Sequence, residues 1–344
     1  MNLLILVVNT NGKMISFTDN GIYCRQGDFY VDPWKPAAKA LITHGHSDHA
    51  RWGSAAYLCH LYTVPILKLR LGNDISVQGV EYGETIFING VKVSFHPAGH
   101  IIGSAQIRLE YKGEVWVISG DYKLGDDLLS TPFELVKCQH FVTESTFGLP
   151  VYDFQSAEKI YQDINEWCKT NATDGFNSVL LGYALGKSQA VLHSLSVESD
   201  KVFLHGAVAN VNTALSEVGF RFKGKRIMQE TVKGELKEAV VVAPPSALGT
   251  PWLKKLQPCK IAICSGWMAL RGARRRYGVD KGFALSDHCD WQQLNDAVVG
   301  TGAEHVYVTH GYETAFVRWL KEKYLLDAYE VKTLFNNREN EEDL

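Results

Sequence analysis

One six-residue segment, His44-Gly45-His46-Ser47-Asp48-His49, constrains the chemistry and the fold of this chain more than any other. Neutral imidazole and carboxylate groups are the ligands that zinc and similar cations prefer, and four of them stand in this one segment. With 12 histidines in 344 residues, the composition predicts such a string roughly once in a thousand chains of this length. The alternative is a group of capping and solvated polar residues at a strand-to-helix turn. We interpret the segment as part of a metal site.

The spacing of the segment predicts how its ligands divide between two metal ions. In an extended stretch successive side chains alternate between faces, so His44 and His46 point the same way and can bind one ion. If the chain turns into a helix near Ser47, Asp48 and His49 face a second ion a few ångströms away. Two hydrolytic ions need about seven donors including one bridge, so further ligands must come from elsewhere in the chain.

Four candidates for the remaining roles lie at predicted strand ends, where a scaffold can hold side chains rigidly. They are His100 after Pro97-Ala98-Gly99, Asp121 after residues 117–120, His288 in Ser286-Asp287-His288, and His310 before Gly311. His96 is an alternative to His100 as a ligand, although only His100 follows a glycine. The other histidines have no partner spacing and are interpreted as structural: His60, His140, His193, His205 and His305. Cys289 is interpreted as a packing residue, because no pattern of a base and a nucleophile accompanies it.

The size and composition of the chain predict a globular protein that does not cross a membrane. Its 344 residues are too many for one ordinary core and suggest two domains. Hydrophobic residues make up 46% and charged residues 21%, and no window reaches 18 apolar residues. The apolar stretch at residues 3–8 lacks a preceding basic flank and is short for a secretion signal. We therefore expect no export, and Met14 is an alternative start to Met1.

The cysteines predict free thiols in a reducing compartment. The seven of them form an odd set without any CxxC pair: Cys24, Cys59, Cys138, Cys168, Cys259, Cys264 and Cys289. Disulfides are rare where the cell keeps thiols reduced, and a secreted domain of this kind would show paired cysteines. We therefore expect a cytoplasmic protein.

The charge of the chain restricts where nucleic acid could bind. The formal net charge of −3 excludes a general attraction to polyanions, so binding must come from a local patch. Residues 221–226 carry four Lys or Arg and no acid, and residues 271–281 carry five against one Asp. For both runs the alternative is an ordinary solvated surface. The acidic residues at 339–343 are interpreted as a solvated, disordered tail.

The pattern of predicted elements changes after residue 150. Before it we expect short strands at residues 29–31, 39–43, 85–88, 91–95, 105–109 and 115–118, with tight turns at Asn89-Gly90 and Lys112-Gly113. After it we expect helices from Ser156, from about Lys187, from about Ala209 and around Trp252, alternating with strands at 178–181, 202–204, 239–242 and 261–263. Helices at 291–299 and 314–324 flank a last strand at 306–309. The alternation predicts parallel strands in a small α/β layer inserted within one domain.

Together these motifs resemble the metallo-β-lactamase fold and, within it, the β-CASP nucleases, which process RNA or DNA. The resemblance covers nearly the whole chain and rests on Asp32-Pro33, the HxHxDH segment, Gly99-His100, Gly120-Asp121, residues 143–148, residues 183–189, His288 and Thr309-His310-Gly311. The stretch from Ser265 through the arginine run to Asp280 is similar to the bacterial DNA-ligase-associated exonucleases of this family. The resemblance implies an α/β fold in which residues 1–150 and 276–335 form a metallo-β-lactamase αββα sandwich. Residues 151–275 would form an inserted β-CASP-type α/β domain, and residues 336–344 an acidic tail.

The resemblance also implies roles for individual residues. His44, His46 and His100 would hold one divalent ion, Asp48, His49 and His310 would hold the other, and Asp121 would bridge them, with zinc as the expected metal and manganese as the alternative. His288 would protonate the departing oxygen, and Glu144 would orient His288 and keep it charged. Asp48 is also expected to be a catalytic residue. Lys187, Ser265, Arg271 and Arg274 would bind phosphates. Gly186-Lys187-Ser188 is not an ATP site, because the upstream glycine spacing of a P-loop is absent.

These expectations favour a metal-dependent DNA exonuclease in DNA repair or processing. The resemblance implies an ATP-dependent DNA ligase and a helicase as partners. An RNase of the same family is the alternative, because a histidine at position 310 follows the pattern of RNA-processing members, whereas eukaryotic DNA-acting members tend to have an apolar residue there. A small-molecule hydrolase of this fold and a scaffold without activity are further alternatives. A small substrate needs neither a large insert nor an arginine run, and a scaffold does not need a complete ligand set.

Overall fold

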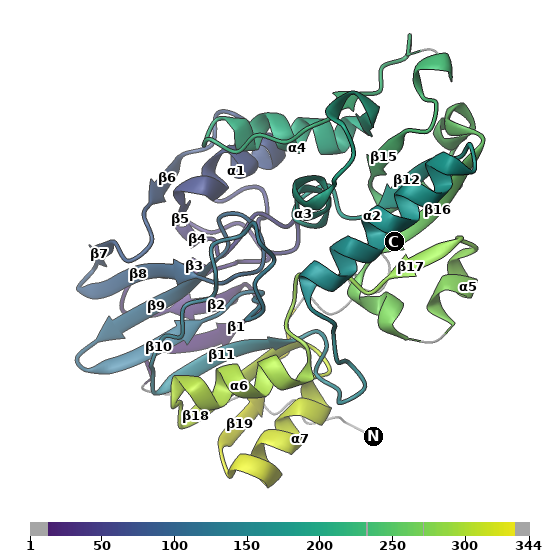
Figure 1. Cartoon of the computed structure of the whole chain (residues 1–344). Coiled ribbons are helices and arrows are strands. Elements are labelled where there is room, and N and C mark those ends of the chain that lie inside the picture. The colour runs from purple at the N-terminus through teal and green to yellow at the C-terminus, as the bar shows by residue number, and fades with distance from the viewer. Residues whose placement is uncertain (1–12, 232, 271, 334–344) are drawn as a thin grey trace, which may run out of the picture.

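The computed structural model describes residues 13–231, 233–270 and 272–333, but not the side chains at 233, 273 and 274. The predicted features at residues 1–8 and 336–344 lie outside this part of the chain. The described residues form a mixed α/β structure with three sheets, of six, seven and six strands (Figure 1). None of the described helices combines the length and the apolar character that a membrane span requires.

The first sheet follows the order of the chain. β1, β2 and β3 pair antiparallel, and β3 to β6 pair parallel. Helix α1 (Val64–Leu71) covers the outer face and buries Leu67 and Leu71 against it. The strands are β1 (Ile15–Thr18), β2 (Gly21–Cys24), β3 (Phe29–Val31), β4 (Ala40–Leu41), β5 (Tyr57–His60) and β6 (Val77–Val80).

The second sheet has the strand order β19-β18-β11-β10-β9-β8-β7. Asn89 and Gly90, with φ of 48° and 82°, form the predicted two-residue loop between β7 and β8. Helices α6 (Trp291–Thr301) and α7 (Glu313–Tyr324) cover its outer face. The strands are β7 (Thr85–Ile88), β8 (Val91–Pro97), β9 (Ala105–Tyr111), β10 (Glu114–Ile118), β11 (His140–Ser145), β18 (His305–Gly311) and β19 (Asp327–Glu330).

Apolar side chains fill the space between these two sheets. Phe29 and Leu41 from the first sheet belong to one core with Phe95 and Trp116 from the second, and each is at most 1% exposed. Because side chains alternate along a strand, Val117 faces the other side and packs with α6 and α7. The result is a four-layer arrangement of helix, sheet, sheet and helix.

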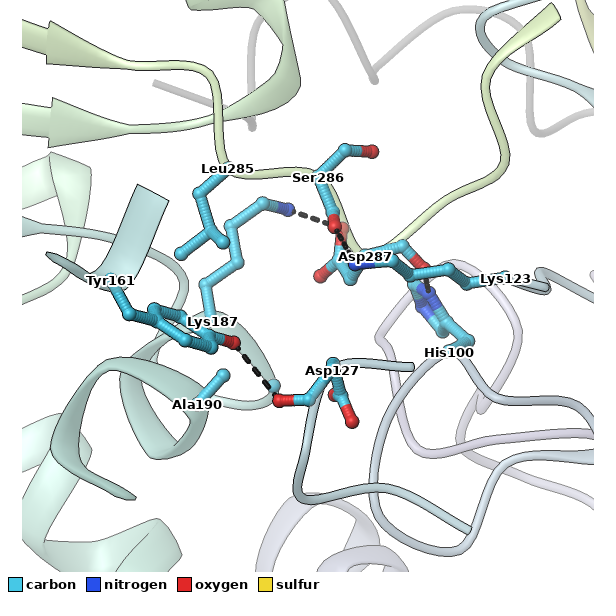
Figure 2. A pocket seen from close by; sticks show the side chains of 10 residues that line it. His100, Lys123, Asp127, Tyr161, Lys187, Ala190, Leu285, Ser286 and Asp287 are labelled. Atoms are coloured by element: carbon cyan, nitrogen blue, oxygen red, sulfur yellow. Dashed lines mark hydrogen bonds and ion pairs between the residues drawn. The ribbon is translucent and has the colours of Figure 1, made fainter. Parts of the chain in front are cut away.

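The chain leaves the second sheet after β11 and returns to it in β18, which pairs directly with β11. Between them lies the inserted layer, a third sheet of six parallel strands with helices α2, α3 and α4 on one face. Where this layer meets the second sheet, His100, Lys187 and Asp287 surround a small pocket (Figure 2). Its elements are α2 (Ala157–Thr173), β12 (Asn177–Leu181), α3 (Lys187–Ser194), β13 (Val202–Leu204), α4 (Gly206–Ser216), β14 (Lys225–Arg226), β15 (Val240–Ala243), β16 (Cys259–Cys264), α5 (Ala273–Tyr277) and β17 (Lys281–Phe283).

Some elements differ from the prediction. The segment around Trp252 is a 3₁₀ helix (Pro251–Leu256), which suits buried leucines spaced by three residues, and not an α-helix. Helix α4 begins at Gly206, because the His205 side chain accepts a hydrogen bond from the N–H of Ala207. Helix α1 was not predicted, since its apolar residues do not follow one face. The other strands and α-helices absent from the prediction have at most six residues: β1, β2, β5, β6, β11, β14, β17, β19 and α5.

Replacement of Phe95 tests the packing between the first two sheets. Phe95 on β8 is fully buried, whereas Phe87 on the neighbouring β7 is 72% exposed. We expect Phe95→Ala to lower the free energy of unfolding by about 3–5 kcal/mol, because it removes buried apolar contacts and leaves a cavity. Phe87→Ala should change it by no more than about 0.5 kcal/mol. Urea denaturation followed by tryptophan fluorescence measures both changes, and equal effects would contradict this assignment of the core.

Candidate metal centre

Histidine and aspartate side chains from separate strand ends converge at one edge of the first two sheets. β8 and β10 are both antiparallel to β9, and β11 and β18 continue in the direction of β10, so the carboxyl ends of β8, β10, β11 and β18 lie together. All of the converging residues are among the ligands predicted from the sequence. They are His44, His46 and His49 after β4, His100 after β8, Asp121 after β10, and His310 in β18.

The HxHxDH segment forms a single tight turn, so the helix expected near Ser47 is wrong. The N–H of Ala50 donates to the carbonyl of His46 at 2.8 Å and closes this turn. Gly45 allows the turn to lie against α1, because a Cβ at this position would come within 2.6 Å of Cγ2 of Ile66. A longer helix is therefore not needed to bring the histidines of this segment to one place.

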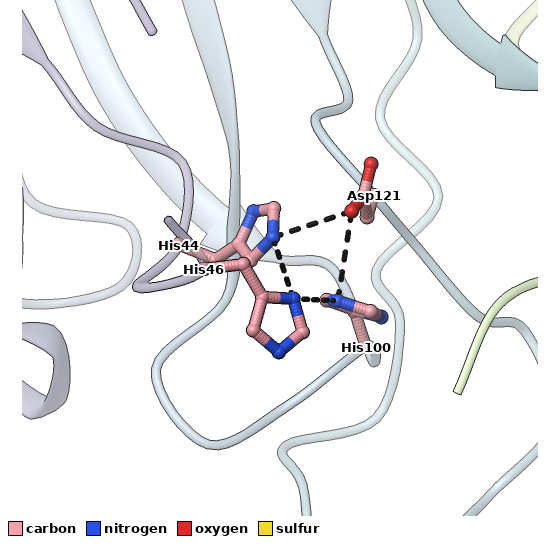
Figure 3. Close-up of side chains that lie close together, drawn as sticks. All are labelled: His44, His46, His100 and Asp121. Carbon is pink, nitrogen blue, oxygen red and sulfur yellow. Dashed lines mark hydrogen bonds and ion pairs between the residues drawn. The ribbon is translucent and has the colours of Figure 1, made fainter. Parts of the chain in front are cut away.

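Four side chains form a first set of possible ligands, group one: His44, His46, His100 and Asp121 (Figure 3). Nδ1 of His46 lies 3.2 Å from Nε2 of His44 and 3.1 Å from Nε2 of His100. Oδ2 of Asp121 lies 3.3 Å from Nε2 of His44 and 3.7 Å from Nε2 of His100. Zinc–nitrogen bonds of about 2.0–2.1 Å place the corners of a tetrahedron about 3.3 Å apart. The donor atoms of group one therefore fit one ion of this size.

A second set, group two, consists of His49, His310 and Asp121. Oδ1 of Asp121 lies 3.3 Å from Nε2 of His49 and 3.0 Å from Nε2 of His310. A carboxylate oxygen of Asp48 lies 3.6 Å from Nε2 of His49, and this side chain is 25% exposed. Because one oxygen of Asp121 faces group one and the other faces group two, this carboxylate can bridge two ions.

Asp32 is a buried residue of the site to which the sequence analysis gave no role. Its carboxylate accepts hydrogen bonds from the N–H and the hydroxyl of Thr43, at 2.8 and 2.6 Å, and lies 2.8 Å from Nδ1 of His49. A carboxylate on the outward nitrogen of a histidine fixes its tautomer and orientation for metal binding. The only signal in the sequence was an aspartate before a proline, which is also typical of any turn.

Burial and neighbouring charges set the protonation states of the possible ligands. Burial, together with His49, lowers the pKa of His44 well below its usual value, so this imidazole is neutral. Burial opposes ionisation of Asp121, but the nearby histidines hold its pKa well below the usual range. For His49 burial is outweighed by Asp121 and Asp48, which raise its pKa well above the usual value. A cation at group two would therefore displace a proton from His49.

Glu144 and His288 form a pair beside both groups. Both carboxylate oxygens of Glu144 lie 2.9 Å from Nδ1 of His288, and the N–H of Tyr122 donates to one of them at 2.9 Å. Although burial opposes it, Glu144 raises the pKa of His288 to about 9. The rings of His288 and His100 have centroids 4.6 Å apart. The pair thus places a protonated imidazole next to group one near neutral pH.

The residues predicted to bind substrate lie in different environments. The side chain of Lys187 is buried, and its ammonium lies 2.7 Å from Oδ1 of Asp287 (Figure 2). Phosphate binding by Lys187 would require this ion pair to open. The hydroxyl of Ser265 accepts a hydrogen bond from the N–H of Trp267 at the start of a 3₁₀ helix. Arg271 and the side chain of Arg274 lie outside the described residues.

The basic run at residues 221–226 is largely engaged with the protein itself. The guanidinium of Arg221 donates to the carbonyl of Ser216, and that of Arg226 donates to the side-chain oxygen of Asn210 at 2.8 Å. The ammonium of Lys223 donates to backbone carbonyls at the end of α3 and just beyond it. These contacts favour the interpretation of this run as ordinary surface over a nucleic-acid patch.

The remaining histidines and the cysteines lie outside both groups. His96 pairs with Glu134, His60 stacks on Tyr82, and His140 stacks on Trp116 and on His305. Cys289 is buried, and burial raises the pKa of its thiol well above the usual value, which disfavours a nucleophile. All seven cysteines are free thiols.

Comparison with known proteins finds relatives among proteins that act on nucleic acids. A probable DNA ligase from Opitutus terrae is 32% identical over 308 residues, which is 88% of this chain and 30% of that protein. The endoribonuclease YSH1 from Eremothecium gossypii is 27% identical over 118 residues, which is 34% of this chain and 15% of that protein. The chain thus spans less than a third of the length of these relatives.

A solved structure from Enterococcus faecalis, of a protein of unknown function, has the same fold. The match has a TM-score of 0.56 and 14% identity and covers 78% of this chain and 74% of that one. No family model matches the chain. The chain belongs to the metallo-β-lactamase fold proteins, in the β-CASP nuclease family.

Proposed function

We propose that the chain is a two-metal phosphodiesterase whose substrate is DNA. The observation that carries the proposal is the carboxylate of Asp121, which is shared between groups one and two beside the His288–Glu144 pair. In this proposal group one would hold one ion, Asp48, His49 and His310 would hold the other, and Asp121 would bridge them. Zinc is the proposed metal and manganese the alternative.

The inserted layer supports nucleic acid as the substrate. We assign residues 151–275 to a β-CASP-type domain within a metallo-β-lactamase domain made of residues 1–150 and 276–335. Residues 151–275 carry 16 Lys and Arg against 11 Asp and Glu, whereas the whole chain carries 35 against 38. This positive balance attracts a polyanion to the inserted layer, although the chain as a whole is slightly acidic.

The geometry of the site gives each protein group a task in phosphodiester hydrolysis. When bound, two divalent ions would activate a water near neutral pH and would neutralise charge on the attacked phosphate. Because Nδ1 of His288 is bonded to Glu144, its Nε2 is the atom that donates a proton to the departing oxygen. Glu144, which is fixed by the N–H of Tyr122, keeps this imidazole oriented and charged.

DNA is preferred over RNA because a relative whose match covers 88% of this chain is named a probable DNA ligase. With the resemblance of residues 265–280, this supports an exonuclease in DNA repair or processing with an ATP-dependent DNA ligase as a partner. A helicase partner is proposed from the resemblance, and a location in the cytoplasm from the free cysteines. An RNase is the second candidate, because His310 lies in group two and another relative is named an endoribonuclease. A small-molecule hydrolase would leave the basic inserted layer without a role.

Digestion of matched end-labelled DNA and RNA tests the proposal. The purified full chain with zinc or manganese should degrade single-stranded or duplex DNA faster than RNA of the same sequence. Strands labelled at the 5′ and 3′ ends, digested side by side, show the polarity and whether an end is required. Faster cleavage of RNA would favour the second candidate. Degradation of neither nucleic acid would contradict the proposed function.

Asp121→Asn tests the shared carboxylate with little change in size. Removal of a residue that only hydrogen-bonds to a metal ligand lowers metal affinity or activity by roughly 10–100-fold. Because Asp121 would itself be a ligand, we expect more than about a hundredfold loss of rate together with a lower metal content. Asp290→Asn is the matched control, because Asp290 is also buried but caps α6 through the N–H of Gln293, and asparagine caps equally well. Digestion rates and metal analysis measure both variants. Full activity of D121N would exclude the bridging role.

Glu144→Gln tests the proton donor through the pH dependence of kcat. A general acid acts in its protonated form, so the rate falls as pH rises through its pKa. Since Glu144 raises the pKa of His288, its replacement should lower that pKa and move the alkaline limb of the profile to lower pH. Glu134→Gln is the control, because it removes the carboxylate of a similar pair with His96 outside both groups. An alkaline limb that does not move in E144Q would argue against His288 as the acid.

A further inference from the structure

Each histidine of the two groups has one ring nitrogen that faces the other possible ligands and an outward nitrogen that faces away from them. The hydrogen-bond partners of these outward nitrogens come from different parts of the chain. Three of them have a partner in or beside the first two sheets. These contacts are 3.1 Å from His44 to Thr43, 2.8 Å from His49 to Asp32 and 3.2 Å from His310 to Thr309. The partners belong to the same four-layer scaffold as the histidines and do not involve the inserted layer.

His46 and His100 instead direct their outward nitrogens at backbone carbonyls that follow β11 in the chain. Nε2 of His46 lies 3.2 Å from the carbonyl of Leu185, in the turn between β12 and α3 of the inserted layer. Nδ1 of His100 lies 2.8 Å from the carbonyl of Asp287, in the segment that returns after β17 (Figure 2). A carbonyl only accepts hydrogen bonds, so each outward nitrogen carries the proton. The inward nitrogen is left with the lone pair that a metal needs.

The turn of residues 185–187 is fixed against group one by two further contacts. Gly186 has a φ of 90°, and a Cβ there would come within 2.5 Å of Cγ2 of Ile101, the residue after His100. The ion pair between Lys187 and Asp287 has a length of 2.7 Å, and the two side chains are 7% and 8% exposed. This pair joins the two segments that carry the acceptor carbonyls.

We propose that Lys187 is a positioning residue for group one, and that through Asp287 it holds the carbonyls of Leu185 and Asp287 against His46 and His100. The inference rests on the proposed metal-binding role of group one. It gives Lys187 a different role from the phosphate binding expected from the sequence. Two of the three histidines of group one thereby depend on how the inserted layer lies against the sheets, whereas the histidines of group two do not.

The consequence of losing Lys187 follows from the burial of its partner. Without the ammonium, the buried carboxylate of Asp287 loses its nearest cation and keeps only Nε2 of His288, at 3.7 Å. We expect it to turn toward water and to displace its own backbone carbonyl. His100 then loses the acceptor that fixes its tautomer, and the turn that carries Leu185 loses one of its anchors. The affinity of group one for a metal ion should fall, while group two keeps its partners.

Lys187→Met tests the proposal, because methionine keeps the apolar stem and removes the charge. Titration of the metal-free full chain with Zn²⁺ in competition with a chromophoric chelator should show two sites in the wild type. In K187M one site should weaken by about 10–100-fold, as expected for an outer partner of a metal ligand, and the other should be unchanged. In a His310→Ala background group two lacks a donor atom. If Lys187→Met lowers zinc affinity by the same factor in this background, the weakened site is group one.

Matched variants separate positioning from general destabilisation. Gly186→Ala should weaken the same site, because a Cβ would push the turn away from Ile101, and it changes no charge. Gly219→Ala is its control, since Gly219 also has a positive φ of 96° but nothing within 4 Å of an added Cβ. Lys223→Met removes another lysine of the inserted layer that donates to backbone carbonyls, and zinc affinity should stay unchanged.

Three outcomes would overturn the inference. Unchanged zinc affinity of both sites in the folded variants K187M and G186A would overturn it and leave the proposed function intact. An equal loss of zinc affinity at both sites would also overturn the inference and leave the proposed function intact, because it would indicate general loosening of the structure. A wild type that binds neither zinc nor manganese would contradict the proposed function and the inference together. Far-UV circular dichroism identifies folded variants, and G186A decides the question if K187M does not fold.

Discussion

The parallel pairing of β11 with β18 is the interaction on which the rest of the site depends. The hydroxyl of Thr309 donates to the carbonyl of Thr143, 166 positions away in the sequence, and the hydroxyl of Ser145 donates to the carbonyl of His310. Gly311 permits this approach, because a Cβ there would lie 2.2 Å from the carbonyl oxygen of Ser145. The pairing brings the strands before and after the inserted layer together in the second sheet. His310 therefore lies next to Asp121, whose carboxylate belongs to both groups.

Two kinds of support then act on the ligands. The donor atoms extend from strand ends that are held by packed sheets, which fixes where each side chain begins. The orientation of each imidazole is fixed separately, by the partner of its outward nitrogen. For group two this partner is a side chain of the scaffold, whereas for His46 and His100 it is the backbone of segments that the chain reaches only after β11. The two groups therefore differ in what they need from the inserted layer.

The sequence predicted the parts of this site that depend on residue type and spacing. The clustered histidines, the strand-end positions of His100 and Asp121 and the alternation of the inserted layer all have a pattern that a single sequence displays. Contacts made by the backbone have no such pattern, because every residue carries a carbonyl group. Nothing in the sequence distinguishes the carbonyl of Leu185 from the others. The buried pair of Lys187 with Asp287 was equally hidden, because a lysine beside glycine and serine is typical of phosphate binding. The helix expected near Ser47 was wrong because one turn, closed at Ala50, already suffices.

The bond between His46 and the carbonyl of Leu185 also bears on how such a protein can be shortened or recombined. A layer of more than 100 residues between two paired strands resembles a cassette that could be excised, leaving a smaller hydrolase behind. Here excision would take away the acceptor of His46, and any new linker would have to rebuild that of His100. The four-layer scaffold alone is therefore not an intact catalytic unit, and scaffold and layer must be inherited, or transplanted, as one piece.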